Sequence, residues 1–276
     1  MSRYAYYKLK DMITNVEALA WGIGFIEFWV IMWIFVFSPS SPQEAGWGEA
    51  VVKGNIAMAY SFLGILSMSS AAVGLTAGIY RSSFARRFIT KFGRLGPASL
   101  IAEDFAGSIA SIVLFAGVIF FSVEALSYAR WGTLVVPENP VGVLADLVLA
   151  GIILYWIAYD IAMALIVARR VRGVSGGSML SLIVGFIVYA QLWVSFGKAA
   201  YAVPLAPVPA LLMYHSLGTY PPIGAYLLWL TGAGKVEAID LRLAALSSIL
   251  WVAALALIAV VLTRKGGAVS VEELGM

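Results

Sequence analysis

Two acidic residues, Glu27 and Asp160, lie deep inside apolar stretches of this sequence. An ionised acid at the centre of a bilayer costs on the order of 2.5–3.5 kcal/mol, so such residues usually face a bundle interior, a polar partner or a water-filled path. A structural hydrogen bond and a functional role remain open for each. Two further acids, Glu124 and Asp146, are expected near the outer surface, where charge costs little and no specific role is needed.

Other polar and small residues stand inside apolar stretches. Tyr189 and Gln191 place polar groups where they are able to line a path. Small residues recur at every fourth position, which allows close helix approach either within the chain or between subunits. These small residues are Ser70, Gly74 and Gly78. The single histidine, His215, is expected to be hydrogen-bonded or solvent-facing rather than a metal ligand.

A basic segment carries three phenylalanines at helical spacing. Phe84, Phe88 and Phe92 fall at i, i+4 and i+8, so they share one face of a helix. Arg87 and Lys91 project from other faces. This pattern suits a groove on a partner protein, with aromatic anchors and a charged rim. It equally suits an interfacial helix that holds its aromatic residues in lipid.

The sequence lacks the motifs of common catalytic sites. It has no cysteine and one histidine, which cannot supply two axial ligands to a haem. The metalloprotease motif H-E-x-x-H and the phosphate-binding P-loop are absent. We therefore expect no catalytic residue, no metal site and no cofactor in this chain.

The amino-acid composition indicates a membrane protein. The chain has 276 residues, of which 62% are hydrophobic and 12% charged, and its mean hydropathy is +0.92. Soluble domains are roughly 45–50% apolar and about 25% charged. A nucleic-acid-binding protein is excluded, because the basic residues behind the net charge of +3 are dispersed between apolar runs. The scarcity of Asn and Gln suggests a thermophilic source.

We predict an all-α, polytopic membrane protein whose residues 1–276 form one transmembrane domain. Residues 1–20 are expected to form an amphipathic helix in the plane of the interface. Six spans follow, at 19–37, 54–80, 105–129, 141–168, 178–197 and 241–263.

The outer loop 199–240 contains five prolines and two apolar runs, 210–217 and 223–231, which are too short to cross the bilayer. They are predicted to be paired short re-entrant helices, and one kinked seventh span is the alternative.

The basic residues predict the orientation. With six spans, most of the 18 lysines and arginines lie on the side that holds both termini, the loop 81–104 and the tail 265–276. Because cytoplasmic loops carry the excess of Lys and Arg, both termini are expected in the cytoplasm. The predicted location is the cell membrane, with several passes.

Together these parts resemble the permease subunit of type-2 ABC exporters. The shared order is an interfacial helix, six spans, a cytoplasmic coupling helix at 84–92, a Pro-x-Ser turn at Pro97-Ala98-Ser99, and two short outer helices. The sequence departs from the commoner pattern of that family at two pairs. Arg86-Arg87 and Gly93-Arg94 stand where Glu-Arg and Gly-Thr are usual.

The resemblance implies a second permease copy, identical or different, and two cytoplasmic ATPase partners that bind ATP and magnesium. It implies that the protein lies in the lipid bilayer and exports a substrate across the membrane. The residues implied to dock the ATPase are Phe84, Arg87, Phe88, Lys91 and Phe92. Those implied to line the path are Glu27, Tyr189 and Gln191.

Two other hypotheses remain open. An ion-coupled secondary transporter would use Glu27 and Asp160 as proton-linked groups. Such folds usually have interrupted helices in both halves, whereas only the second half is interrupted here. A membrane anchor subunit of a larger complex is the third hypothesis.

Overall fold

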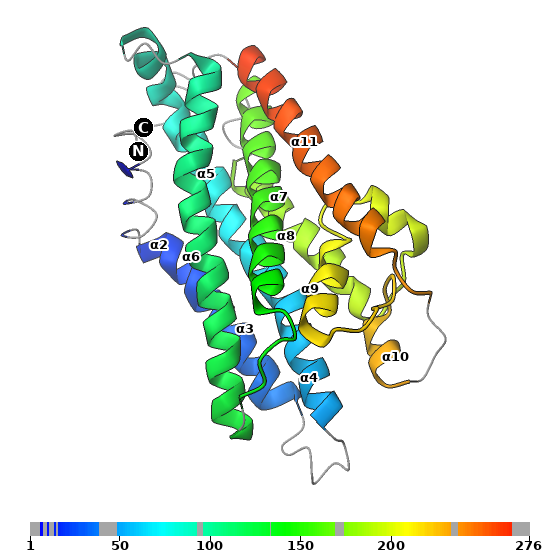
Figure 1. Ribbon diagram of the computed structural model, residues 1–276. Coiled ribbons are helices and arrows are strands. Elements are labelled where there is room, and N and C mark those ends of the chain that lie inside the picture. Colours follow the sequence, from blue (N-terminus) through cyan, green and yellow to red (C-terminus); the bar gives the residue numbers. More distant parts are fainter. Residues whose placement is uncertain are drawn as a thin grey trace.

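The computed structural model describes residues 6, 7, 10, 14, 16–38, 49–92, 96–132, 134–168, 174–232 and 237–266, and only the backbone of residues 17, 18, 21, 22, 26, 49, 81, 82, 84–92, 97, 174 and 175. The described part consists of helices joined by loops and contains no strand (Figure 1). Two isolated antiparallel β-bridges, Ser195–Gly224 and Pro222–Ala238, join loop residues that are distant in the sequence. The all-α prediction is confirmed, whereas most of the interfacial helix predicted at 1–20 lies outside the described residues.

The first helical rod runs through four consecutive segments. These are α2 (Val16–Leu19), η1 (Ala20–Gly24), α3 (Phe25–Ile31) and η2 (Met32–Phe37), of which η1 and η2 are π-helical. The rod covers the first predicted span. Ser38 ends it, because its backbone N–H and its hydroxyl both donate to the carbonyl of Trp33, at 2.9 and 2.8 Å.

The second rod is longer than predicted. It consists of α4 (Glu49–Met58), the π-helical η3 (Ala59–Leu63) and α5 (Gly64–Phe92), and its apolar part is Ala50–Tyr80. The sequence predicted a span that ends near Tyr80 and a separate short helix at 84–92. Residues 84–92 are helical, but they are the last turns of α5. Residues 79–92 contain neither Gly nor Pro, so nothing in the sequence breaks the helix there.

The next two helices are α6 (Pro97–Trp131), which contains the third predicted span but begins eight residues before it, and α7 (Pro140–Val167), which agrees with the fourth. Each begins with proline at a position where the missing N–H costs nothing. Gly132 ends α6 in the left-handed region at φ 68°. The Asn139 side chain caps α7 by accepting a hydrogen bond from the Gly142 N–H at 2.9 Å.

The last third of the chain contains one long helix and several short ones. They are α8 (Val174–Tyr189), η5 (Ala190–Leu192), η6 (Gly197–Ala202), α9 (Val208–Leu217), α10 (Tyr226–Leu230) and α11 (Leu241–Lys265). The two short helices expected within the outer loop are present as α9 and α10. The sixth predicted span is present as α11, whose N-terminus is capped by the Asp240 carboxylate.

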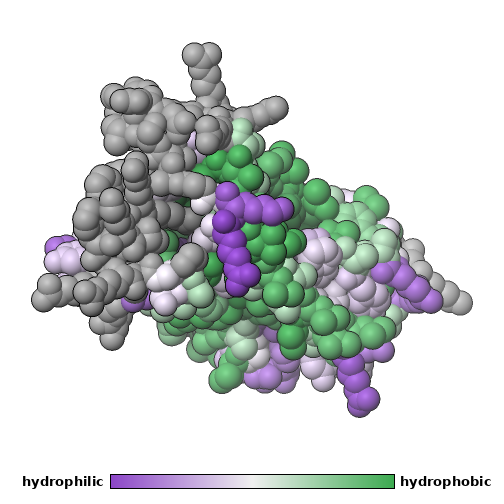
Figure 2. Space-filling model, turned by 90° about the horizontal axis from the view of Figure 1, so that it is seen from above, coloured by the Kyte–Doolittle hydropathy of each residue, from purple (hydrophilic) through white to green (hydrophobic). Residues whose placement is uncertain are grey.

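Four described helical stretches are long and apolar enough to cross a membrane, which indicates a membrane-embedded protein. They are Ala50–Tyr80, Ala98–Trp131, Pro140–Val167 and Leu241–Lys265. Among the described residues, shorter apolar helical stretches, Glu27–Phe37 and Gly176–Leu192, lie at the first and fifth predicted spans. In the view from above, hydrophobic residues make up most of the visible described surface (Figure 2).

Helix α7 is the centre of the bundle, packed by α5, α6, α8, α9 and α11 (Figure 1). Its side chains Leu147, Tyr155 and Tyr159 are fully buried. The C-terminal ends of α5, α7 and α11 and the start of α6 lie at the same, upper end of the molecule (Figure 1). Helices α9 and α10 lie toward the opposite end, where they pack with α4 and η3 in a second hydrophobic cluster.

Candidate functional site

The residues predicted to line a path make separate contacts. Glu27, half-buried on α3, accepts a hydrogen bond from the hydroxyl of Ser122 on α6. Gln191 is 1% exposed and donates through Nε2 to the carbonyl oxygen of Ala206 at 3.1 Å. The Tyr189 ring packs edge-on against Trp193, with 5.2 Å between centroids. The amide of Gln191 therefore anchors the turn before α9.

The carboxylate of Asp160 has no partner among the described residues. Both of its carboxylate oxygens are buried and have no hydrogen-bond partner among the described residues. Ile119 of α6 and Leu147 of α7 both border Gly64, so they lie at the same height in the bundle. Ser122, which contacts Glu27, lies three residues beyond Ile119 toward one end of the bundle, and Asp160 lies thirteen residues beyond Leu147 toward the other end. At 1.5 Å per residue these two separations place Asp160 about 24 Å from Glu27 along the helix axes. The two acids therefore do not belong to one site.

Glu124 of α6 and Tyr60 of η3 form a buried pair that the sequence did not predict. Glu124 is 9% exposed and Tyr60 is fully buried. The Tyr60 hydroxyl donates to Oε1 of Glu124 at 2.5 Å and lies 3.4 Å from the carbonyl oxygen of Phe120. The Phe120 ring stacks on Tyr60 at a centroid distance of 5.6 Å. Oε2 of Glu124 is buried and has no partner in the described part of the chain.

Asp146 of α7 and His215 of α9 form a second pair. Oδ2 of Asp146 and Nδ1 of His215 are 2.6 Å apart, and their side chains are 9% and 26% exposed. The N–H of Asn139 also donates to the carbonyl oxygen of His215 at 2.8 Å. These contacts fasten the C-terminal end of α9 to the N-terminal end of α7. The expectation that His215 is hydrogen-bonded is confirmed.

Glu124 and Asp146 were expected near the outer surface with no specific role, but each makes a specific contact, with Tyr60 and His215 respectively. Both acids are buried, because η3 covers Glu124 and α9 covers Asp146. Each covering segment is far away in the sequence, so local hydropathy carries no signal of it. A search for hydroxyl and imidazole groups in the other apolar stretches would have found Tyr60 and His215 as candidate partners.

The remaining predicted residues lie on α5. Ser70 is 3% exposed and packs inside the bundle. Gly74 and Gly78 are exposed, and no heavy atom of another described segment lies within 4 Å of the position that a Cβ would take at either. This part of α5 therefore presents an open surface of small residues. The predicted docking residues Phe84, Arg87, Phe88, Lys91 and Phe92 occupy its last helical turns.

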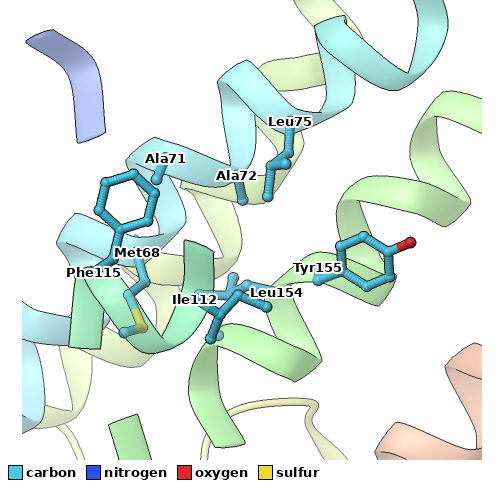
Figure 3. A pocket seen from close by; sticks show the side chains of 9 residues that line it. Met68, Ala71, Ala72, Leu75, Ile112, Phe115, Leu154 and Tyr155 are labelled. Atoms are coloured by element: carbon cyan, nitrogen blue, oxygen red, sulfur yellow. The ribbon is translucent and has the colours of Figure 1, made fainter. Parts of the chain in front are cut away.

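An apolar cleft opens between α5, α6 and α7 (Figure 3). The only polar side chain in its wall is that of Tyr155, whose hydroxyl points away from the other lining residues and donates to Asp104 at 2.8 Å. The cleft is suited to apolar groups and has no polar contact for a charged ligand. Its walls are formed by Met68, Ala71, Ala72, Leu75, Ile112, Phe115, Gly151, Leu154 and Tyr155.

The described residues include no cluster of three or more histidine, aspartate or glutamate side chains that could hold a metal ion. No protein-family model matches the sequence, and no curated protein matches it.

Proposed function

We propose that this protein is the membrane-spanning permease subunit of an ABC exporter, in which a separate cytoplasmic ATPase hydrolyses ATP. The observation that carries the proposal is the length of α5. Its backbone stays helical to Phe92, twelve residues beyond Tyr80, where its apolar part ends. At 1.5 Å per residue this extension is about 18 Å long. A rigid extension of a buried helix is what a soluble motor needs in order to move a membrane domain.

The chemistry of the extension supports a protein partner. Phe84, Phe88 and Phe92 follow one another at intervals of four residues on one helix. Such a stripe is an anchor for a hydrophobic groove, and the neighbouring Arg87 and Lys91 provide a charged rim. Because α5 packs along α7 and α8, a force applied at its end is transmitted to the centre of the bundle.

The short helices at the opposite end of the molecule form the proposed exit gate for the substrate. Helices α9 and α10 each span too few residues to cross a bilayer. Broken helices are tolerated at membrane depth only where protein or a water-filled cavity shields them. Here Ala210, Leu212 and Tyr226 are fully buried. In the proposed mechanism α9 and α10 are the re-entrant outer helices of a six-span protein, and they control release of the substrate.

The proposed orientation has both termini and the upper end of the bundle in the cytoplasm. Arg264 and Lys265 end α11 at the same end as the basic extension of α5, as expected for the cytoplasmic side of the cell membrane (Figure 1). The active unit would contain a second permease copy, identical or different, and two ATPase partners that bind ATP and magnesium.

An ion-coupled transporter is the main competing function. Its support is Asp160, whose carboxylate has no partner among the described residues. However, the distance of about 24 Å between Glu27 and Asp160 leaves them without a shared site. Transport that an uncoupler abolishes, and that needs neither ATP nor a partner chain, would favour this alternative. Purification with partners that include no ATPase would favour an anchor subunit.

The test is a charge placed in the phenylalanine stripe. We expect Phe88→Asp to weaken association with the ATPase and to uncouple ATP hydrolysis from transport in reconstituted vesicles, because the groove would have to accept an ion. The matched control is Leu134→Asp, at a side chain that is 61% exposed in the loop between α6 and α7, and it should leave both unchanged. Undiminished association and transport in Phe88→Asp would contradict the proposal.

A further inference from the structure

We propose that Glu124 and Tyr60 form a proton-binding site in the half of the bundle that holds α9 and α10. Neither the ATPase nor the transported substrate is needed for this inference, which rests on the pair's burial, its hydrogen bonds and the apolar helices around it. The ligand is a single proton, taken up by the carboxylate of Glu124 from water at that end of the molecule. Tyr60 positions the carboxyl group and shares its hydrogen bond.

Glu124 forms no ion pair with a described residue. A buried carboxylate is stable only when it is paired or fully hydrogen-bonded, and otherwise it binds a proton. One oxygen of Glu124 contacts Tyr60, and the other has no partner among the described residues. Among the described residues, charged groups of the surrounding helices have contacts elsewhere: Arg130 lies over Phe35 at 5.7 Å, Lys53 is 4.0 Å from Glu138, Asp146 contacts His215, and Glu27 contacts Ser122.

The hydrogen bonds fit the protonated acid better than the carboxylate. The Tyr60 hydroxyl has one hydrogen and two acceptors in reach, Oε1 of Glu124 at 2.5 Å and the carbonyl oxygen of Phe120 at 3.4 Å. With a proton on Oε1, Glu124 donates to the Tyr60 oxygen and the Tyr60 hydroxyl donates to Phe120. The one unpaired atom is then a neutral carbonyl oxygen, whose burial costs much less than that of an anionic oxygen.

The position of the pair links it to the outer helices. Tyr60 lies in the π-helical turn η3, and such turns occur frequently at functional sites. Helix α9 packs against η3, so a movement of α9 reaches Tyr60 directly. Glu124 is seven residues from the end of α6 at Trp131, or about 10 Å along the axis. A proton therefore has a short way to travel once α9 moves aside.

Infrared spectroscopy tests the site on the whole protein in lipid vesicles at pH 7. Labelling with ¹³C-glutamate separates glutamate bands from those of Asp160 and the other aspartates. We expect the difference spectrum between wild type and Glu124→Gln to show loss of the carbonyl band of one protonated carboxylic acid. The matched control is Glu138→Gln, whose side chain is 59% exposed, and it should remove a carboxylate band instead.

A second variant keeps the acid in place. Tyr60→Phe removes the hydroxyl but little volume, so the carbonyl band should remain and shift to higher frequency because its hydrogen bond is lost. The proposal is overturned if Glu124→Gln removes a carboxylate band, as Glu138→Gln does. It is also overturned if the protonated band of Tyr60→Phe stays at the wild-type frequency.

Discussion

The contact between α7 and α9 can be broken by one methyl group. Gly142 lies in the first turn of α7, directly beneath the His215 ring. A Cβ at this position would be 2.6 Å from Cγ and 2.7 Å from Cδ2 of His215, and 2.7 Å from Nδ2 of Asn139. Carbon atoms in contact normally stay about 3.5–4.0 Å apart. In Gly142→Ala the ring therefore has to move by about 1 Å, which breaks its 2.6 Å contact with Asp146.

The expected loss of stability combines three effects. Overpacking of this size costs about 1–3 kcal/mol. Loss of a hydrogen bond to a charged group costs about 1.5–3 kcal/mol, and the lower value applies because His215 is 26% exposed and water replaces part of the bond. Alanine gains up to about 1 kcal/mol of helix propensity over glycine. The net loss is about 2 kcal/mol, or roughly thirtyfold in the unfolding equilibrium.

Reversible unfolding in mixed detergent micelles measures this loss as a double-mutant cycle with His215→Ala. Without the ring, the methyl group meets only the Asn139 side chain, so Gly142→Ala should cost far less in that background. The coupling energy is expected at about 1.5–2 kcal/mol. A Gly142→Ala protein as stable as wild type would refute the reasoning, and so would an undiminished cost in the absence of His215.

Three further outcomes follow from close contacts and burial. Gly151→Ala should destabilise the protein by about 1–3 kcal/mol, since a Cβ would overlap Cγ2 of Ile112, whereas Gly117→Ala, with no atom within 4 Å, should be neutral or slightly stabilising in the same unfolding assay. Tyr226→Phe should be as stable as wild type or about 1 kcal/mol more stable, because the fully buried hydroxyl has no partner among the described residues. Burial raises the pKa of the Tyr226 phenol in the folded protein, so the folded state holds this proton more tightly than the unfolded state does. The free energy of unfolding is therefore unaffected by this group below the ordinary pKa of about 10 and decreases as the pH rises above it. Unfolding curves between about pH 9 and 11 should fall less steeply for Tyr226→Phe than for wild type.

The helices were predictable because their signals are local. The prolines and caps that begin α6, α7 and α11 stand directly before long apolar runs, so the predicted bounds of 141–168 and 241–263 agree with α7 and α11 to within two residues. The short helices α9 and α10 were predictable for the same reason, since the prolines around them divide the apolar stretch.

The polar pairs were not predictable because their partners are distant in the sequence. Glu124 is close to the end of an apolar run, which by itself indicates a surface position. Only the packing of η3 against α6 buries it, and only the packing of α9 against α7 buries Asp146. The continuation of α5 beyond Tyr80 was missed for another reason. Hydropathy marks where a helix leaves the apolar phase, whereas the helix itself continues until a breaking residue.

Cross-linking from position 88 is the most direct test of the ATPase-driven permease. The chain has no cysteine, so Phe88→Cys gives a unique attachment point for a photoreactive reagent in native membranes. Mass spectrometry of the cross-linked product should identify a soluble P-loop ATPase, and a membrane-impermeant maleimide should label the same cysteine only from the cytoplasmic side. Labelling from outside, or products that never include an ATPase, would contradict the proposed function.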